Sequence, residues 1–338
     1  MALPKHLKTK LPRLGARVAV LSFVGVTSFS SSARAFPPQM LESDSADGAA
    51  LALSPFPAPP GLKPAVRFWR DLFTQHASDR VVVHDRSNLD VVWRVVELPK
   101  RDDGTVDEQA GEKVVKAAVE DLKARLRRLA TDPTATDDED RILLSLAGND
   151  PRRFEGACDR LRTQQGVADR FREGYARAQP WLDQVRQILA EEGVPTQMAA
   201  LPFVESMFNP MARSYAGAVG AWQLMPATAR DYGLKVQRGK GDDRQDVMRS
   251  TRAAARLLRS YYRLLGSWPL ALTGYNYGGY GLKRLCDRLG TTDLVTLIGE
   301  DEKAPIGFAA RNFYAEFLAA MDVLTETIAA SSSSSVRD

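Results

Sequence analysis

Apolar residues recur at spacings of three and four from Glu112 to about residue 324, and this periodicity restricts the fold more than any other feature. The spacing places apolar side chains on one face of successive helices, which Gly and Pro separate from one another. Two β-branched runs, at 80–85 and 90–97, are joined by four residues and predict one hairpin. We therefore expect a mainly α fold with a small β-hairpin near 80–97 as its only sheet.

The N-terminus has the features of a secretory signal peptide. Residues 1–35 contain six basic and no acidic residues, an apolar run at 18–29, and an Ala33-Arg34-Ala35 step. This order of charged region, short apolar region and small-residue site is typical of a signal peptide cleaved after about Ala35. The apolar run is shorter than the roughly 20 residues that a spanning helix needs. We therefore expect export to the periplasm or the cell envelope.

Charge, cysteine and histidine content exclude several classes of function. Loss of the six basic residues of the signal takes the formal net charge from +4 to −2, so nucleic-acid binding has little support. Cys158 and Cys286 are the only cysteines, and a disulfide or two separate buried thiols would both fit the sequence. His6 leaves with the signal, and the other two histidines are isolated. We expect no metal site, no histidine-dependent triad and no cofactor.

Composition divides the rest of the chain into four parts. Residues 36–64 are rich in Pro, Ala and Ser and predict an extended leader that is not part of the core. Residues 65–190 predict a helical N-terminal region around the hairpin, in which 153–166 is helical. Residues 191–326 are again helical but contain unusual clusters of Gly, Asn, Tyr and Trp. Residues 327–338 include five consecutive serines and predict a disordered tail.

One carboxylate lies in an almost wholly apolar helix that is predicted to begin near Pro195 and to end at Asn209-Pro210. Desolvation and the negative end of the helix dipole both disfavour the anion of Glu205. Its pKa should therefore rise toward the range of a general acid. This segment alone is equally compatible with a structural Glu that pairs with an arginine at the edge of the core.

Two further clusters combine glycines with aromatic and amide side chains. The run 217–226 contains Trp222 and Gln223, which can offer a sugar an apolar face and directed hydrogen bonds. A helix start with a buried tryptophan is the alternative. The run 271–280 ends an apolar helix in tyrosines and glycines, which would otherwise be an ordinary helix end with surface tyrosines.

In their order and spacing, these motifs resemble the catalytic domain of the SLT-type lytic transglycosylases, and most of all the membrane-bound lytic murein transglycosylase D type. The resemblance covers about residues 193–324. It rests on Val204-Glu205-Ser206 followed by Phe208-Asn209-Pro210, Gly220-x-Trp222-Gln223-x-x-Pro226, Asp242-x-Arg244-x-Asp246, and Tyr275-Asn276 followed by Gly278. It implies a lysozyme-like helical catalytic domain at 191–326. It also implies an enzyme that cleaves the β-1,4 bond between N-acetylmuramic acid and N-acetylglucosamine and leaves 1,6-anhydromuramic ends.

The resemblance implies roles for individual residues. Glu205 would protonate the bridging oxygen and then, as a carboxylate, take the proton of the muramic C6 hydroxyl, so a second catalytic carboxylate is not expected. The implied substrate-binding residues are Ser206, Gln223, Met225, Tyr275, Asn276 and Tyr314. We expect Asp246 to cap the following helix and Arg244 to pair within its loop.

The chain departs from the family pattern near its C-terminus. Family members carry a tyrosine that faces the catalytic Glu in a late Arg-Asn-Tyr motif, whereas this chain reads Arg311-Asn312-Phe313-Tyr314. Either Tyr314 takes that role, or Phe313 occupies the place and the hydroxyl is missing.

Two other functions stay open at the level of sequence: a muramidase that hydrolyses the same bond, and a non-catalytic scaffold that binds the cell wall. The implied partners are the glycan strands of peptidoglycan. An envelope protein is a further candidate partner, through residues 65–190, and we expect a monomer.

Overall fold

The computed structural model describes residues 54–237, 241–299 and 306–334. The predicted signal peptide and most of the predicted leader lie outside these ranges. The α-helices are α1 (Lys63–Thr74), α2 (Glu108–Thr131), α3 (Asp138–Leu146), α4 (Ala157–Arg160), α5 (Ala168–Ala178), α6 (Leu182–Glu191), α7 (Leu201–Ser206), α8 (Pro226–Asp231), α9 (Val247–Leu265), α10 (Trp268–Tyr277), α11 (Gly279–Leu289), α12 (Leu294–Ile298) and α13 (Phe308–Ser334). The strands are β1 (Arg80–Asp85), β2 (Val92–Glu97) and β3 (Leu161–Gln165), and 3-10 turns occur at η1 (Pro60–Leu62), η2 (Pro151–Phe154), η3 (Thr196–Ala200) and η4 (Asp243–Gln245). The prediction of a mainly α fold with a hairpin is confirmed.

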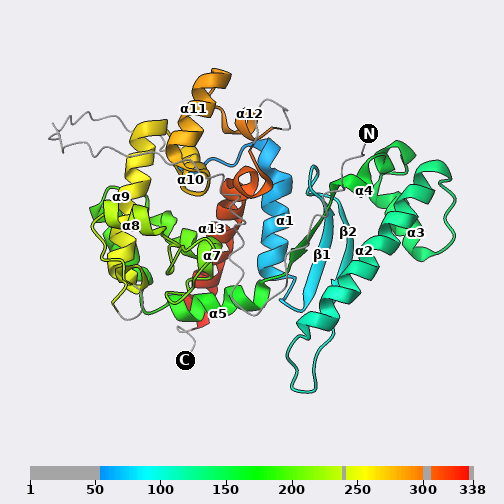
Figure 1. The fold of residues 1–338 in the computed structure, drawn as a ribbon, viewed down its shortest axis with the longest axis horizontal. Helices are drawn as coiled ribbons and strands as arrows, with labels where there is room; N and C mark the ends of the chain where they lie inside the picture. Colours follow the sequence, from blue (N-terminus) through cyan, green and yellow to red (C-terminus); the bar gives the residue numbers. More distant parts are fainter. Residues whose placement is uncertain (1–53, 238–240, 300–305, 335–338) are drawn as a thin grey trace, which may run out of the picture.

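An antiparallel sheet with the strand order β2-β1-β3 lies between α1 and α2, as Figure 1 shows, and it separates two hydrophobic cores. Successive residues of a strand point to opposite faces. Val81 and Val83 pack in the smaller core with α2, α3 and α4, while Val82 belongs to the larger core of the helical body. The sheet is thus covered on both faces. It joins the layer of α2, α3 and α4 to the helices of the larger core.

The third strand corrects the sequence prediction, which placed a helix over 153–166 and only a hairpin in the sheet. Residues 161–165 instead pair with β1, with Val83 opposite Thr163. Without β3, the backbone N–H and C=O groups on that edge of β1 would lack partners between two layers of helices. The need to pair this edge outweighs the weak helical periodicity of the segment.

The first and the last helix of the described residues meet in the larger core, where α1 packs along α13 (Figure 1). Phe56 is buried, and its ring meets Phe317 of α13 edge-on at 5.0 Å between centroids. The end of the predicted leader is therefore part of the core, because an aromatic side chain in the Pro-rich run finds an apolar partner 261 positions later. The same core includes α5 and α6, so the predicted division at residue 190 would run through it.

The last helix is longer than predicted. α13 continues to Ser334, so residues 327–334 of the predicted disordered tail are helical, and 335–338 lie outside the described residues. Ser331 donates a hydrogen bond to the Thr327 carbonyl at 2.9 Å and accepts one from the Tyr175 hydroxyl at 3.2 Å. These two hydrogen bonds satisfy the Ser331 hydroxyl within α13 and link it to α5.

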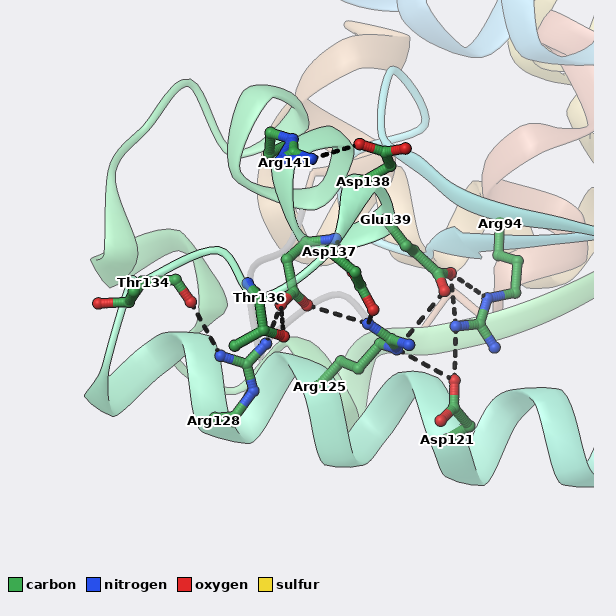
Figure 2. A network of polar contacts seen from close by, with 11 residues as sticks. Arg94, Asp121, Arg125, Arg128, Thr134, Thr136, Asp137, Asp138, Glu139 and Arg141 are labelled. Atoms are coloured by element: carbon green, nitrogen blue, oxygen red, sulfur yellow. Dashed lines mark hydrogen bonds and ion pairs between the residues drawn. The ribbon is translucent and has the colours of Figure 1, made fainter.

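A network of ion pairs fixes the corner between α2 and α3 (Figure 2). Asp140 is fully buried and accepts hydrogen bonds from Thr136 at 2.8 and 2.6 Å, from Arg125 at 3.1 Å, and from Arg128. Burial opposes ionisation, but these bonds hold the pKa of Asp140 well below its usual range. The corner therefore depends on one buried anion with several donors.

The two cysteines lie in different cores. Cys158 belongs to the smaller core and Cys286 to the larger, and both thiols are free. The structure thus decides for separate thiols. Among the described residues, no helix is long and apolar enough to cross a membrane.

Candidate active site

Glu205 lies near the end of α7, a short helix that follows η3 and packs against α13. The helix ends because Met207 and Phe208 have φ values of 51° and 53°. A left-handed conformation at two consecutive non-glycine residues is strained and is common beside functional groups. The prediction of a short helix that ends before Asn209-Pro210 is confirmed.

The Glu205 side chain is only 5% exposed. Burial raises its pKa to about 8. Among the residues that the structure describes, no cation forms an ion pair with this carboxyl, so the alternative of an arginine-paired Glu is not found. The group is therefore protonated at neutral pH and can donate that proton, as a general acid must.

A second buried carboxyl lies close to Glu205, and sequence analysis did not find it. Glu316 on α13 is 4% exposed, and both burial and the charge of Glu205 raise its pKa well above the usual range. Its Oε1 atom is fully enclosed and has no hydrogen-bond partner within the described ranges. A Glu between apolar residues of a helix was the signal that selected Glu205, and it would have selected Glu316 as well.

Tyr275 of α10 completes this group. Its hydroxyl donates a hydrogen bond to the Trp222 carbonyl at 2.7 Å, and burial together with Glu205 raises its pKa well above 10.0. The following residue, Asn276, is partly buried and has no side-chain hydrogen bond to a described residue. Both residues thus lie on the helix end that adjoins Glu205, but only Tyr275 is coupled to it.

Ser206 connects α7 to the loop of residues 217–224. Its buried hydroxyl donates to the Ala221 carbonyl at 2.9 Å and accepts from the Asn209 amide at 3.0 Å. The hydroxyl is therefore bonded to backbone on both sides of α7. In the structure it positions the end of the helix that carries Glu205.

The side-chain amide of Gln223 is held in a fixed orientation by hydrogen bonds from its nitrogen, while its oxygen has no partner among the described residues. Its Nε2 donates to the Gly220 carbonyl at 2.7 Å and to the Ala212 carbonyl at 3.4 Å, while Oε1 is buried without a partner among the described residues. Two backbone acceptors around Nε2 settle which end of the amide is which. The Oε1 atom is thus an unused acceptor for an N–H donor such as an acetamido group.

Trp222 and Arg244 form a framework that holds the 217–226 run. Trp222 is fully buried and donates from Nε1 to Thr251 at 2.8 Å, so the alternative of a buried tryptophan holds and no face is open to a sugar. Arg244 pairs with Asp242 and donates to the Gly217 and Leu224 carbonyls at 2.9 and 3.0 Å. The expected pairing of Arg244 within its loop is confirmed, and it also fastens this second loop.

Asp246 behaves as predicted from the sequence. Its side chain accepts a hydrogen bond from the Arg249 amide at 2.9 Å and caps α9. The acidic residues of this loop therefore have structural partners.

The two remaining predicted site residues differ in their surroundings. Met225 is 39% exposed at the start of α8 and can contact a ligand. Tyr314 is buried, and its hydroxyl donates to the Pro57 carbonyl at 2.8 Å. Tyr314 lines a cavity of about 390 Å³ together with Pro55 and Trp268. Its hydroxyl is thus directed to the leader, and Phe313, also fully buried, offers none.

Within the described ranges, no group of three or more His, Cys, Asp or Glu side chains is arranged to hold a metal ion. What the arrangement offers is a protonated carboxyl in an apolar setting, a second protonated carboxyl, and an amide acceptor. Such a set can donate a proton to a buried oxygen and can hold an amide-bearing ligand.

The family comparison matches the part of the chain that holds Glu205. Residues 186–292 match the family model described as the transglycosylase SLT domain. The chain carries an SLT domain. The predicted resemblance to lytic transglycosylases is thereby confirmed, and the domain includes Glu205, Ser206, Gln223 and Tyr275 but neither Tyr314 nor Glu316.

Two curated relatives are similar over the same segment. The membrane-bound lytic murein transglycosylase D of Escherichia coli (strain K12) is 39% identical over 103 residues, which are 30% of this chain and 23% of the relative. A putative tributyltin chloride resistance protein of Alteromonas sp. (strain M-1) is 36% identical over 104 residues, 30% of this chain and 50% of the relative. The chain thus spans half or less of these relatives, and the similarity is confined to the SLT domain.

A solved structure of an inactive mutant of the lytic transglycosylase Slt from Pseudomonas aeruginosa is also similar. It is 19% identical, with a TM-score of 0.36, and the match covers 65% of this chain and 35% of that one.

Proposed function

We propose that this chain is a peptidoglycan lytic transglycosylase that cleaves the β-1,4 bond between N-acetylmuramic acid and N-acetylglucosamine. Glu205 donates its proton to the bridging oxygen. The carboxylate then takes the proton of the muramic C6 hydroxyl as that oxygen attacks C1, which closes a 1,6-anhydro ring. The proton count balances, because Glu205 ends the reaction protonated, as it began.

The observation that carries this proposal is the protonated, buried carboxyl of Glu205 inside an SLT domain. A pKa of about 8 suits both halves of the reaction, since the acid holds its proton at neutral pH and its conjugate base is strong enough to take one back. The free Oε1 of Gln223 supports the choice of ligand, because both sugars carry an acetamido N–H.

Hydrolysis of the same bond would need a second, ionised carboxylate to activate water or to attack the sugar. Glu316 is the second carboxyl near Glu205, and burial keeps it protonated. A neutral carboxylic acid is neither a base nor a nucleophile. The arrangement therefore favours the intramolecular reaction over a muramidase.

Digestion of isolated sacculi tests the proposal. Wild-type enzyme should release muropeptides that are lighter by one water than the products of a muramidase, as mass spectrometry would show. Glu205→Gln should reduce release by roughly 10²- to 10⁴-fold, the usual contribution of a general acid. Hydrated products would show a muramidase, and binding to sacculi without any release from wild type would show a wall-binding scaffold.

We propose further that residues 1–35 direct export to the periplasm or envelope and that the mature enzyme is a monomer. A basic stretch, a short apolar run and an Ala33-Arg34-Ala35 step support cleavage after about Ala35. N-terminal sequencing of the exported protein would identify a different processing site if this were wrong. Residues 65–190 are the proposed contact for an envelope partner.

A further inference from the structure

Glu316 has no role in the proposed reaction, although its carboxyl is buried beside that of Glu205. It projects from α13, the helix against which α7 packs. Its Oε1 has no partner in the part of the chain that the structure describes. Buried polar atoms almost always have hydrogen bonds, so an exception needs an explanation. A partner that exists only during the reaction would provide one.

The reaction creates such a partner when Glu205 gives up its proton. The new carboxylate then lies in a site that favours its neutral form, and no cation among the described residues contributes to its pKa. The hydroxyl protons of its other neighbours are committed, since Tyr275 donates to Trp222 and Ser206 donates to Ala221. Among the described side chains, the carboxyl of Glu316 is the uncommitted O–H donor near Glu205.

The ionisable groups that interact with Glu205 and Glu316 within the described ranges are carboxyls and tyrosine hydroxyls. Glu205 comes from α7, Glu316 from α13 and Tyr275 from α10, and Tyr261 of α9 adjoins Tyr275. Two adjacent carboxyls cannot readily ionise together, and one proton is then held more tightly. Burial and the charge of Glu205 both favour the proton on Glu316. Glu316 is thus a carboxylic acid throughout the reaction.

We propose that Glu316 is a positioning residue that donates a hydrogen bond, directly or through one water molecule, to the carboxylate that Glu205 becomes during the reaction. The proposal rests on the proposed function. The two carboxyls are not hydrogen-bonded to each other in the structure, so the contact forms as substrate binds, which is common for catalytic hydrogen bonds. Glu316 keeps its own proton, and no bond to it forms or breaks.

Kinetics of Glu316→Met and Glu316→Gln on purified glycan strands test this role. Methionine fills the volume but donates nothing, so kcat should fall by about 10- to 100-fold with little change in KM, since a hydrogen bond to a charged group is lost. The alkaline limb of the pH profile should move up by about one unit, because the Glu205 anion is less stabilised. Glutamine keeps an N–H donor and should retain kcat within about fivefold, with a smaller upward shift of the limb.

Thermal unfolding and one further variant separate this role from packing. Both Glu316 variants should melt at or above the temperature of wild type, because a buried acid has been removed. Thr327→Val deletes a half-buried hydroxyl from α13 that donates to the Val323 carbonyl at 2.7 Å, and it should leave kcat and the alkaline limb in place.

Two results would overturn the proposal: wild-type kcat and pH profile in Glu316→Met, or a glutamine variant as impaired as the methionine variant. If Glu316→Met does not fold, an unchanged alkaline limb and kcat in Glu316→Gln would also refute it. Failure of the proposed function looks different, because wild type would then release no anhydro product or Glu205→Gln would remain active.

Discussion

At the level of single residues, the buried and protonated carboxyl of Glu205 lowers the free energy of unfolding at neutral pH. Its pKa of about 8 in the folded protein lies above the ordinary glutamate value of 4.5. Between these values the unfolded chain is ionised while the folded chain holds the proton, so the folded state binds more protons and stability falls as the pH rises. The proposed general acid is thus kept protonated at the expense of the fold.

This cost predicts the effect of a neutral replacement. Glu205→Gln should raise the free energy of unfolding by about 1–3 kcal/mol at pH 7.5, because the penalty of burying the acid disappears. At pH 4 the gain should vanish, since both states of wild type are then largely protonated. Denaturant titrations of both proteins at the two pH values provide the measurement, and an equal difference at both would contradict the buried protonated state.

Two glycines of the 217–224 loop provide a matched pair of substitutions. Gly220 and Gly217 have φ values of 89° and 92°, but only at Gly220 would a Cβ meet backbone, 1.9 Å from the Arg244 carbonyl oxygen. Gly217→Ala should cost about 1 kcal/mol through φ alone. Gly220→Ala should cost at least about 3 kcal/mol and also reduce activity, because the loop that bonds Ser206 must shift. Equal melting temperatures for the two variants would show that the loop can move away from the Arg244 carbonyl without loss of stability.

At the scale of elements, the α2–α3 corner depends on the network around Asp140. Its partners are partly exposed arginines, so the ion pairs are weaker than buried ones, yet the carboxylate itself is enclosed. Asp140→Ala should lower the free energy of unfolding by about 2–3 kcal/mol, because several donors lose a buried acceptor. The control is Asp138→Ala, whose side chain is 90% exposed and should change stability by less than about 0.5 kcal/mol.

The pH dependence of this corner has the opposite sign to that of Glu205. The folded pKa of Asp140 is depressed, so its contribution is present at neutral pH and is lost as the pH falls through the acidic range. The destabilisation by Asp140→Ala should therefore shrink in acid. A difference that stays constant from pH 7 to pH 3 would argue against ionised Asp140 in the network.

At the scale of the whole molecule, the SLT domain is completed by helices outside it. Residues 186–292 hold α7, α9, α10 and α11, but α7 and α10 pack against α13, and α13 packs along α1. A fragment of residues 186–292 would expose the apolar faces that these contacts cover. We expect it to lack a cooperative thermal transition, whereas residues 54–338 should unfold cooperatively. Circular dichroism of the two fragments makes the comparison, and sharp melting of the shorter one would show an independent domain.

Features that depend on local pattern can be predicted from the order of the amino acids alone. The 3.6-residue period predicts the helices, the β-branched runs predict the β1–β2 pair, and Asp246 before an apolar run predicts the cap of α9. Glu205 was found because a charged residue in an apolar helix is rare and therefore informative. The family motifs and the SLT domain follow from order and spacing along the chain.

Features that depend on contacts between distant segments become visible only in the packed molecule. β3 exists because β1 needs a second partner, Phe56 is buried because Phe317 meets it, and the Tyr314 hydroxyl is bonded to Pro57. Likewise, α13 carries Glu316 to Glu205 from 111 positions along the chain. Periodicity shows which face of a helix is buried but not which helix covers it. The sequence can therefore mark Glu316 as a carboxyl in an apolar helix, but only the packing of α7 against α13 places it beside Glu205.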